Sequence, residues 1–236
     1  MEKREKLYEG KAKIIYATED PDRVVVYFKD DTTAFDGVKK EEITGKGVIN
    51  NTISSMIFEL LQKRGIPTHF IKKLSDREML AYRVEIIPVE VVVRNYAAGS
   101  FTKRYGIEEG TRLEKPLVET FWKNDELHDP LVCEEHIELL KLADLEDVKE
   151  MKKIALRVNE VLKDFFAAKN IILVDFKLEF GKTSDGKLVL ADEISPDSCR
   201  LWDAKTKKKL DKDVFRYDLG DLQEAYKELL KRLEDT

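Results

Sequence analysis

Cysteine is scarce in this sequence. Cys133 and Cys199 are the only two among its 236 residues. Two cysteines are too few for a disulfide scaffold or for a zinc site built from cysteine. Their scarcity fits a reducing compartment, where disulfides are rare. We therefore expect a cytoplasmic protein.

Long apolar runs are missing as well. No stretch of the sequence approaches the roughly 18 consecutive apolar residues that a membrane helix needs. The charged residues at its start are not followed by the apolar stretch of a signal peptide. The sequence therefore predicts neither a membrane partner nor a secretion signal.

A surplus of basic residues is also absent, since 42 Lys and Arg face 47 Asp and Glu and the net charge is −5. Nucleic-acid binders more often carry a basic surplus, so we expect no nucleic-acid partner. Anionic small molecules are not excluded, because a local cluster of Lys, Arg and metal decides their binding. The length fits either one compact unit or two lobes that share a cleft.

Hydrophobic patterning predicts strands and helices in separate blocks. β-Branched and aromatic runs predict strands, and apolar residues at helical spacing predict helices. Residues 30–47 have the composition of a long polar loop, and residues 110–133 have no regular pattern. These blocks predict an α+β fold rather than a doubly wound α/β fold. The expected strands are residues 12–16, 24–28, 70–74, 79–87, 89–96, 171–180 and 187–194, and the expected helices are 48–64, 145–169 and 219–233.

The strand at residues 171–180 is the most informative segment. It is apolar up to position 174 and then alternates, so that positions 176, 178 and 180 fall on one face. The other face carries Asp175, Lys177 and Glu179. A turn at residues 183–186 predicts a hairpin, and one register of this hairpin places Asp192 opposite Asp175 on the charged face. A slip of one residue would turn Asp192 away.

Carboxylates gathered beside a lysine are costly to bury unless they are compensated. Mg²⁺ is a natural compensator, because it takes carboxylate oxygens and leaves room for phosphate oxygens. A solvated face with ordinary ion pairs fits the same spacing equally well. Further along, residues 192–202 combine an acidic pair, a Ser-Pro break and Arg200. Arginine suits bidentate binding of phosphate or carboxylate, although a surface salt bridge is the simpler reading of Arg200 alone.

Two segments are candidates for binding phosphate. In residues 8–13, Gly10 would let the backbone approach a nucleotide, and Lys11 or Lys13 could contact its phosphates. This segment lacks the patterns of a P-loop or a dinucleotide fingerprint, so by itself it also fits a tight turn beside exposed lysines.

The second candidate is residues 91–100, a buried strand that delivers Arg94 and is followed by small residues. Ser100 could then begin a short helix at residues 101–105, whose N-terminus would attract an anion. The alternative is Ser100 as a plain N-cap, with Arg94 paired to Glu90. The acids, hydroxyls and glycine of residues 30–37 fit either a mobile lid over a substrate or a solvated loop.

Taken together and in this order, five motifs resemble the SAICAR synthetase family, the phosphoribosylaminoimidazole-succinocarboxamide synthases of purine biosynthesis. The resemblance covers nearly the whole chain, and the third and fourth motifs are highly specific. The motifs are YEGKAK at 8–13, DTTAFDG at 31–37, IIPVEVVVRNYAAGS at 86–100, VDFKLEFG at 174–181 and DEISPDSCRLW at 192–202.

The resemblance implies one catalytic unit, residues 1–236, with a two-lobed fold related to ATP-grasp enzymes and kinases. ATP would lie in a cleft between an N-terminal lobe of about residues 1–85 and a C-terminal lobe of about residues 86–236. It implies that ATP, 5-amino-1-(5-phosphoribosyl)imidazole-4-carboxylate (the ribotide) and L-aspartate react to give the succinocarboxamide, ADP and phosphate. Bacterial members of the family often form homodimers, so the resemblance also implies a homodimer.

The resemblance also assigns site residues. Arg94, Ser100 and Arg200 would bind the ribotide phosphate, and Asp36 and its loop would close over the substrates. Asp175 and Lys177 would lie near the imidazole and the transferred phosphoryl group as the catalytic pair. ATP would be bound by Gly10, Lys11, Ala12, Lys13 and Asp192, and Mg²⁺ by Glu179 and Asp192.

Two other functions share these features. A small-molecule kinase would use the same metal carboxylates and phosphate lysines but would stop at phosphoryl transfer, so it would release ADP without aspartate. A non-catalytic nucleotide sensor would bind ATP and show no turnover with all substrates present.

Overall fold

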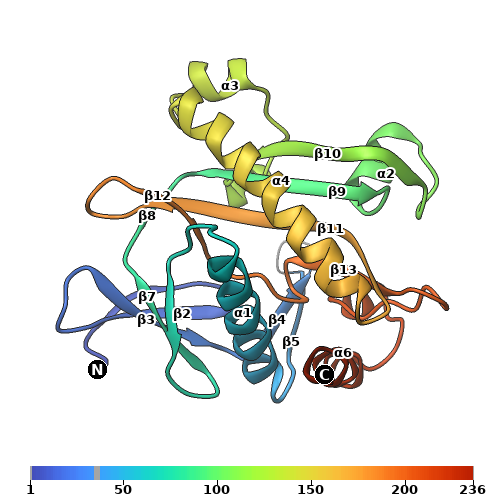
Figure 1. Ribbon diagram of the computed structural model, residues 1–236, viewed down its shortest axis with the longest axis horizontal. Coiled ribbons are helices and arrows are strands. Elements are labelled where there is room, and N and C mark those ends of the chain that lie inside the picture. Colours follow the sequence, from blue (N-terminus) through green and yellow to red (C-terminus); the bar gives the residue numbers. More distant parts are fainter. Residues whose placement is uncertain (1, 35–37, 236) are drawn as a thin grey trace.

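A five-stranded antiparallel sheet forms the N-terminal part of the molecule, in the strand order β1-β2-β3-β7-β6. The computed structural model describes residues 2–34 and 38–235 (Figure 1). The β-branched and aromatic run of β3 is buried at the centre of the sheet. The strands are β1 (Lys6–Glu9), β2 (Lys13–Ala17), β3 (Arg23–Phe28), β6 (Phe70–Lys73) and β7 (Glu78–Tyr82).

A six-stranded sheet forms the second part and is centred on β11 (Ile171–Lys182). One edge of β11 pairs with β9 and β8, and its other edge pairs with β13 and then β12. The chain therefore leaves the sheet between β12 and β13, at residues 192–198. The remaining strands are β8 (Glu85–Ile86), β9 (Val89–Tyr96), β10 (Arg112–Trp122), β12 (Leu188–Ala191) and β13 (Cys199–Asp203).

Helices cover both sheets. The amphipathic helix α4 (Leu145–Ala167) crosses one face of the second sheet and contacts β9, β10 and β11 (Figure 1). Helix α1 (Lys46–Lys63) packs on β3, β6 and β7 of the first sheet and also contacts α6 (Leu222–Glu234). The short helices are α2 (Ser100–Tyr105), η1 (Asp125–Leu127), α3 (Glu134–Leu139) and α5 (Asp213–Arg216).

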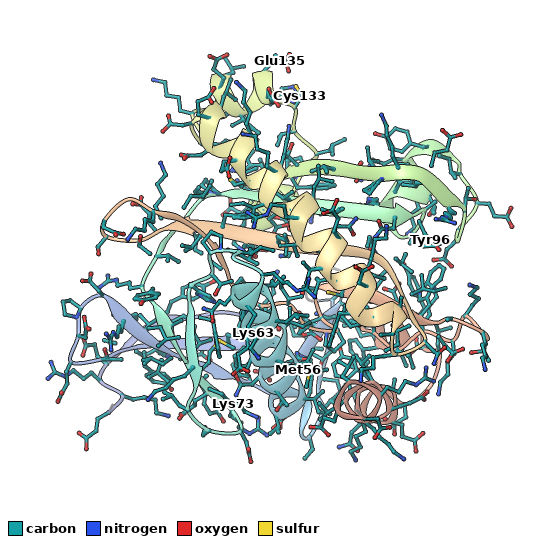
Figure 2. The ribbon with its side chains drawn as sticks, viewed as in Figure 1. Met56, Lys63, Lys73, Tyr96, Cys133 and Glu135 are labelled. Atoms are coloured by element: carbon teal, nitrogen blue, oxygen red, sulfur yellow. The ribbon has the colours of Figure 1, made fainter. Side chains whose placement is uncertain are left out.

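Side chains fill the space between the two sheets (Figure 2). One apolar cluster is continuous across them, from β3 and α1 to α4, β11 and α6. The α+β class predicted from the sequence is confirmed. Within the described part of the chain, no helix has the length and apolar character needed to cross a lipid bilayer.

Two segments that were expected to be irregular form strands instead. Part of the expected loop at residues 30–47 is a hairpin, in which β4 (Asp31–Ala34) pairs with β5 (Lys39–Glu42). The expected irregular stretch at 110–133 contains β10, which pairs with β9 along the edge of the second sheet. Its polar, partly exposed sequence hides the strand, and Pro116 falls where the register shifts, as proline does on edge strands.

Three element boundaries also differ from those predicted. The strand expected at 79–87 is divided, because β7 belongs to the first sheet and β8 to the second. The strand expected at 187–194 ends at Ala191. The last helix begins at Leu222 rather than at 219, because Asp221 caps it by accepting hydrogen bonds from the N–H groups of Gln223 and Glu224.

Candidate active site between the two sheets

The polar face of the second sheet is turned away from α4. On β11 the apolar residues Phe176, Leu178 and Phe180 are buried in the core that α4 covers. The alternation of the strand therefore directs Asp175, Lys177 and Glu179 to the opposite face. β9 and β10 contribute further charged residues to this face, namely Glu90, Arg94 and Glu119.

Two lysines hold the carboxylates at one end of this face. Lys177 Nζ donates to Glu90 Oε1 at 2.6 Å and to Glu179 Oε1 at 3.0 Å. Lys123 Nζ donates to the same Glu179 oxygen at 2.7 Å. Burial alone would lower the pKa of Lys177, but Glu179 and Glu90 outweigh it and raise the pKa above its usual value. Lys177 is therefore a fixed cation at neutral pH, suited to balancing negative charge rather than to accepting a proton.

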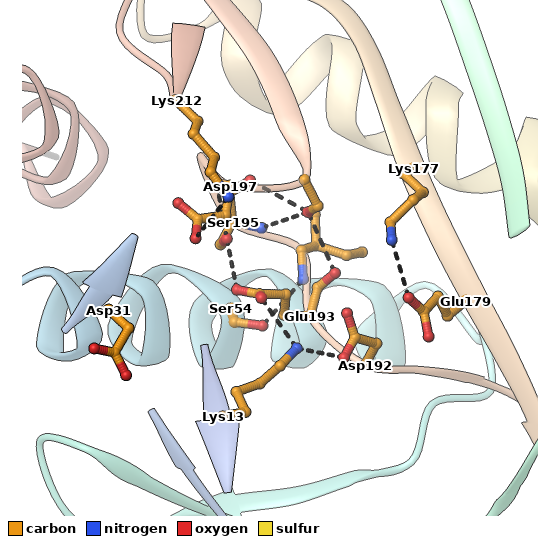
Figure 3. Close-up of polar contacts among 12 residues, drawn as sticks. Lys13, Asp31, Ser54, Lys177, Glu179, Asp192, Glu193, Ser195, Asp197 and Lys212 are labelled. Carbon is orange, nitrogen blue, oxygen red and sulfur yellow. Dashed lines mark hydrogen bonds and ion pairs between the residues drawn. The ribbon is translucent and has the colours of Figure 1, made fainter. Parts of the chain in front are cut away.

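A third lysine comes from the first sheet. Lys13 on β2 forms ion pairs with Asp192 and, at 3.0 Å, with Glu193, both in the segment that leaves the second sheet (Figure 3). Burial raises the pKa of Asp192, but Lys13 and Lys177 outweigh burial and lower it to about 2. This ion pair joins the two sheets directly at the site.

The predicted register of the β11–β12 hairpin is wrong. Glu179 lies opposite Ala191, so Asp192 comes after the last paired residue and does not face Asp175. Asp192 has a positive φ of 60°, which turns the chain out of the strand. Glu179 and Asp192 nevertheless lie on two sides of the same space, with Lys177 and Lys13 beside them (Figure 3).

Asp175 belongs to a second cluster on the same face. Its position pairs with Arg94 of β9 on one side and with Arg200 of β13 on the other. Its carboxylate accepts from Arg94 Nη1 at 2.5 Å and from Arg200 Nη1 at 2.9 Å. Arg94 Nε also donates to Glu119 at 2.6 Å, and Arg200 Nε donates to Asp213 at 2.8 Å. Both arginines are thus aligned by carboxylates.

The alternative interpretations of Arg94 and Ser100 are wrong. Glu90 pairs with Lys177 rather than with Arg94. Ser100 is the first residue of α2, and the N-cap position is taken by Gly99. The Ser100 hydroxyl accepts a hydrogen bond from Arg104 at 3.0 Å and a weak one from Arg94 at 3.4 Å. The short helix expected after this strand is confirmed.

A hollow of about 470 Å³ opens beside these residues. Its lining includes Glu90, Arg94, Ser100 and Arg104. It therefore combines two arginines and a hydroxyl at the start of α2, which is the chemistry that binds phosphate groups.

The segment at residues 10–13 forms the tight connection between β1 and β2. Gly10 N–H donates to the carbonyl of Lys13, and the carbonyl of Ala12 accepts from Lys29. Lys11 is exposed and pairs with Asp125 at 2.9 Å, so the structure does not bring it to the carboxylates that Lys13 contacts. Lys11 instead lines a separate hollow of about 480 Å³ beside the β4–β5 hairpin. Asp36 lies outside the described residues.

The sequence alone did not identify Lys123, Glu193, Glu119 or Asp213 as site residues. It also did not predict that Glu90 binds Lys177 beside Glu179. The spacing on the strand could have placed Glu90 at the site, because Glu90 and Arg94 lie four residues apart and therefore share a face. Lys123 follows β10, which was expected to be irregular, so no periodic pattern pointed to it.

The donor set fits a magnesium ion that is shared with a nucleotide. Within residues 2–34 and 38–235, no three Asp, Glu, His or Cys side chains are arranged as a metal site made by the protein alone. Mg²⁺ usually takes only one or two carboxylates and completes its shell with water and phosphate oxygens. Glu179 and Asp192 supply two carboxylates that face one space, and lysines now balance their charge.

His69 provides a prediction about pH. It is buried, and its Nε2 lies 3.1 Å from the carbonyl of Asp192. Burial lowers its pKa from 6.5 to about 4. The unfolded chain therefore binds the extra proton first, so this contribution to stability is complete above pH 6.5 and is lost as pH falls toward 4.

From pH 7.5 to 4.5 the loss at His69 should be about 2–3 kcal/mol. A His69→Gln variant, whose amide is neutral and can still donate to Asp192, should show a shallower decline in unfolding free energy than the wild type. Urea unfolding at several pH values measures both curves. Parallel curves would show that His69 does not titrate in this way.

Similarity to known proteins extends over nearly the whole chain. The sequence profile of the family described as SAICAR synthetase matches residues 6–233. The phosphoribosylaminoimidazole-succinocarboxamide synthase of Persephonella marina is 64% identical, over 99% of this chain and 98% of its own. The crystal structure of the enzyme of that name from Ehrlichia chaffeensis has a TM-score of 0.95 and 48% identity, covering 98% of this chain and 99% of its own.

A SAICAR synthetase (Type-2) solved in complex with ADP superposes with a TM-score of 0.94. It is 53% identical, and the match covers 97% of each chain. The resemblance predicted from the five motifs is confirmed, and a kinase or a nucleotide sensor is not favoured. The chain belongs to the SAICAR synthetase family, the ATP-dependent ligases that make the succinocarboxamide intermediate of purine biosynthesis.

Proposed function

We propose that the cluster of lysines and carboxylates between the two sheets is where this chain activates the ribotide carboxylate with ATP and joins it to L-aspartate. The observation that carries the proposal is the ion pair of Lys13, from the first sheet, with Asp192 and Glu193 beside the second. The chain acts as one catalytic unit, residues 1–236. ATP lies between a lobe of about residues 1–85 and a lobe of about residues 86–236.

ATP is held from the side of the first sheet. Gly10 and Ala12 let the backbone approach the nucleotide, and Lys11 and Lys13 contact its phosphates. This assignment is supported by the tight connection at residues 10–13 and by the ADP that a relative binds. Glu179 and Asp192 would hold Mg²⁺, which would supply positive charge to the phosphate oxygens.

The ribotide phosphate is held by Arg94, Ser100 and Arg200. Support comes from the hollow beside Arg94 and Ser100, and from the carboxylates that align both arginines. Asp36 and its loop close over the substrates. Asp175, whose carboxylate accepts from both arginines, forms the catalytic pair with Lys177 near the imidazole and the transferred phosphoryl group.

The chemistry explains why the site needs so many cations. A carboxylate resists attack by an amine, because its carbonyl is electron-rich and oxide is a poor leaving group. Transfer of the γ-phosphoryl group to the ribotide carboxylate gives an acyl phosphate and ADP. The aspartate amine then attacks the acyl carbon, and phosphate leaves. Lys177 stays protonated and balances the charge on the transferred group.

The assembly and location complete the proposal. The chain works as a homodimer in the cytoplasm, with small-molecule substrates and without nucleic-acid or membrane partners. Exposed apolar side chains lie around α2 and α3, including Tyr105, Leu131 and Leu139. Such side chains support the proposal that a second copy of the chain covers this surface. Light scattering of the purified protein measures its mass in solution, and a monomer mass would contradict the dimer.

The proposed reaction is tested by omitting each substrate in turn. With ATP, Mg²⁺, the ribotide and L-aspartate present, mass spectrometry should detect the succinocarboxamide together with ADP. No amide product should form when any of them is left out. Rapid ADP release that does not depend on aspartate would indicate a kinase, and ATP binding without turnover would indicate a sensor.

Gly99 gives a sharper test of the ribotide assignment. It has φ 58° and ψ −129°, and a Cβ there would meet the Arg200 guanidinium at 2.3–2.8 Å. Gly99→Ala should therefore displace Arg200 and raise the KM for the ribotide about tenfold or more, the effect of losing about 1.4 kcal/mol of binding. Steady-state kinetics with varied ribotide measures this change.

Gly106→Ala is the matched control at the other end of α2. Gly106 also has a positive φ, 64°, but a Cβ there would meet nothing within 4 Å. It should cost about 1–2 kcal/mol of stability, because a Cβ is strained in the left-handed region, and leave the KM for the ribotide unchanged. Equal effects of the two variants on this KM would remove Arg200 from the proposed phosphate site.

A further inference from the structure

Helix α1 turns a polar stripe toward the segment that carries Asp192 and Glu193. Lys46, Asn50 and Ser54 are spaced by four residues, so they share one face of the helix. All three are buried, and the Lys46 side chain is 0% exposed. A buried ammonium group is costly unless it is paired and fully hydrogen-bonded. This stripe therefore needs partners, and the segment at residues 192–198 supplies them for Lys46 and Ser54.

Asp197 is the partner of Lys46. Lys46 Nζ lies 2.7 Å from Asp197 Oδ2 and also donates to the carbonyl of Asp31 at 2.9 Å. The hydroxyl of Tyr226, on α6, donates to the other carboxylate oxygen of Asp197. Burial raises the pKa of Asp197, but Lys46 and Lys212 outweigh burial and hold it well below its usual range. Asp197 is thus a buried carboxylate fixed by two helices.

Hydrogen bonds lead from this cluster to the carboxylates at the site. Asp197 N–H donates to Ser195 Oγ at 3.1 Å, and Ser195 Oγ donates to Glu193 Oε2 at 2.7 Å (Figure 3). The other oxygen of Glu193 pairs with Lys13. A second anchor joins the same segment to the stripe, because Ile194 N–H donates to Ser54 Oγ at 3.1 Å.

The sheet does not fix this segment by itself. Residues 192–197 lie between β12 and β13 and have no register partner on β11, and backbone contact with β11 resumes where Lys177 N–H donates to the carbonyl of Ser198 at 2.9 Å. Holding the backbone of one residue in a single conformation costs about 1–2 kcal/mol of free energy through lost conformational entropy, and these residues have no ladder hydrogen bonds to offset it. The contacts of Asp197 and Ile194 offset that loss in the folded protein.

We infer that Lys46, Asp197 and Tyr226 form a positioning cluster that holds Glu193 and the proposed metal-binding carboxylate of Asp192 in place. This inference rests on the proposed metal-binding role of Asp192. The three residues act through the backbone of 192–198 and the Ser195–Glu193 bond. Loosening the cluster should therefore weaken binding of the metal–nucleotide complex more than binding of the nucleotide alone.

The test uses Tyr226→Phe, which removes only a hydroxyl, and Lys46→Met, which removes the buried charge. Hydrogen exchange of the protein without ligand should become at least tenfold faster at the amides of 192–198 in both variants. Calorimetric titration should show affinity for ADP with Mg²⁺ falling three- to tenfold in Tyr226→Phe. Affinity for ADP in the presence of a chelator should stay within twofold of the wild type.

Arg232→Met is the matched control. Arg232 also lies on α6 and forms an ion pair with Asp203 at 2.7 Å, but it does not contact residues 192–198. It should lower the melting temperature and leave both ADP affinities and the exchange of 192–198 unchanged.

The inference is overturned if exchange at 192–198 is unaltered in Tyr226→Phe, or if its ADP affinity falls equally with and without Mg²⁺. It is also overturned if Arg232→Met reproduces the effects of Tyr226→Phe. Failure of the proposed metal site would look different, because Mg²⁺ would then not change ADP affinity in the wild type either. If Lys46→Met does not fold, Tyr226→Phe decides the matter by itself.

Discussion

A Glu179→Gln variant is expected to lose at least about 100-fold of the wild-type kcat, while its melting temperature changes by only a few degrees. The amide cannot carry the negative charge that Glu179 directs toward the space it shares with Asp192. Stability should change little, because Lys177 keeps Glu90 as a partner and Lys123 is partly exposed to water. Succinocarboxamide formation at saturating substrates and a thermal unfolding curve provide the two measurements.

Glu146→Gln is the chemical control for this variant. Glu146 is 86% exposed on α4 and pairs only locally, with Lys149. The same replacement there should leave kcat and the unfolding curve as they are. A Glu179→Gln enzyme with near-normal turnover would remove Glu179 from the proposed metal site, and one that fails to fold would show a structural role instead.

Arg94→Ala is expected to destabilise the folded protein strongly. Arg94 is 3% exposed and is hydrogen-bonded to two buried carboxylates, those of Asp175 and Glu119. Removing one partner from a buried ion pair costs about 3–5 kcal/mol, because the other charge is left uncompensated. Urea unfolding at neutral pH measures this loss. Weaker binding of the ribotide should accompany it.

Arg23→Ala provides the comparison at an exposed pair. Arg23 contacts Asp20 at 3.0 Å, and both side chains are more than one third exposed. Such pairs contribute about 1 kcal/mol or less. If Arg94→Ala cost no more than Arg23→Ala, the paired carboxylates would not depend on Arg94, and its effect on the ribotide could be measured by itself.

The sequence predicted the elements whose pattern is strongly periodic. The alternation on β11 separated the faces of Phe176 and Lys177 correctly, because one face is apolar and the other charged. The amphipathic helices α1 and α4 were also predicted, with ends within about two residues, which is the usual uncertainty of helix boundaries. In these elements the buried side chains recur at the period of the secondary structure, so the sequence pattern identifies both.

The elements that were missed depend on partners far away in the sequence. β10 is an edge strand with polar residues and Pro116, and it exists because β9 pairs with it. The position of Asp192 was wrong for a related reason. Hairpin register is set by the pairing of the whole strand, and Asp192 has already left β12.

The sequence predicted which residues belong to the site better than it predicted how they contact one another. Motifs identified Lys13, Asp175, Lys177 and Glu179, which the structure brings to one side of the second sheet. They could not show that Lys123 joins Glu179, or that Glu119 and Asp213 align the two arginines. Such partners come from β10 and α5, so only the folded chain brings them to the site.

The central claim is that the site phosphorylates the ribotide carboxylate before the amide bond forms. The most direct measurement uses ribotide labelled with ¹⁸O in that carboxylate, followed by mass analysis of the inorganic phosphate released. Phosphate that carries one ¹⁸O atom per molecule of succinocarboxamide is expected, because the oxygen that attacks the γ-phosphorus leaves with it. Phosphate without label, formed in step with the amide product, would contradict the claim.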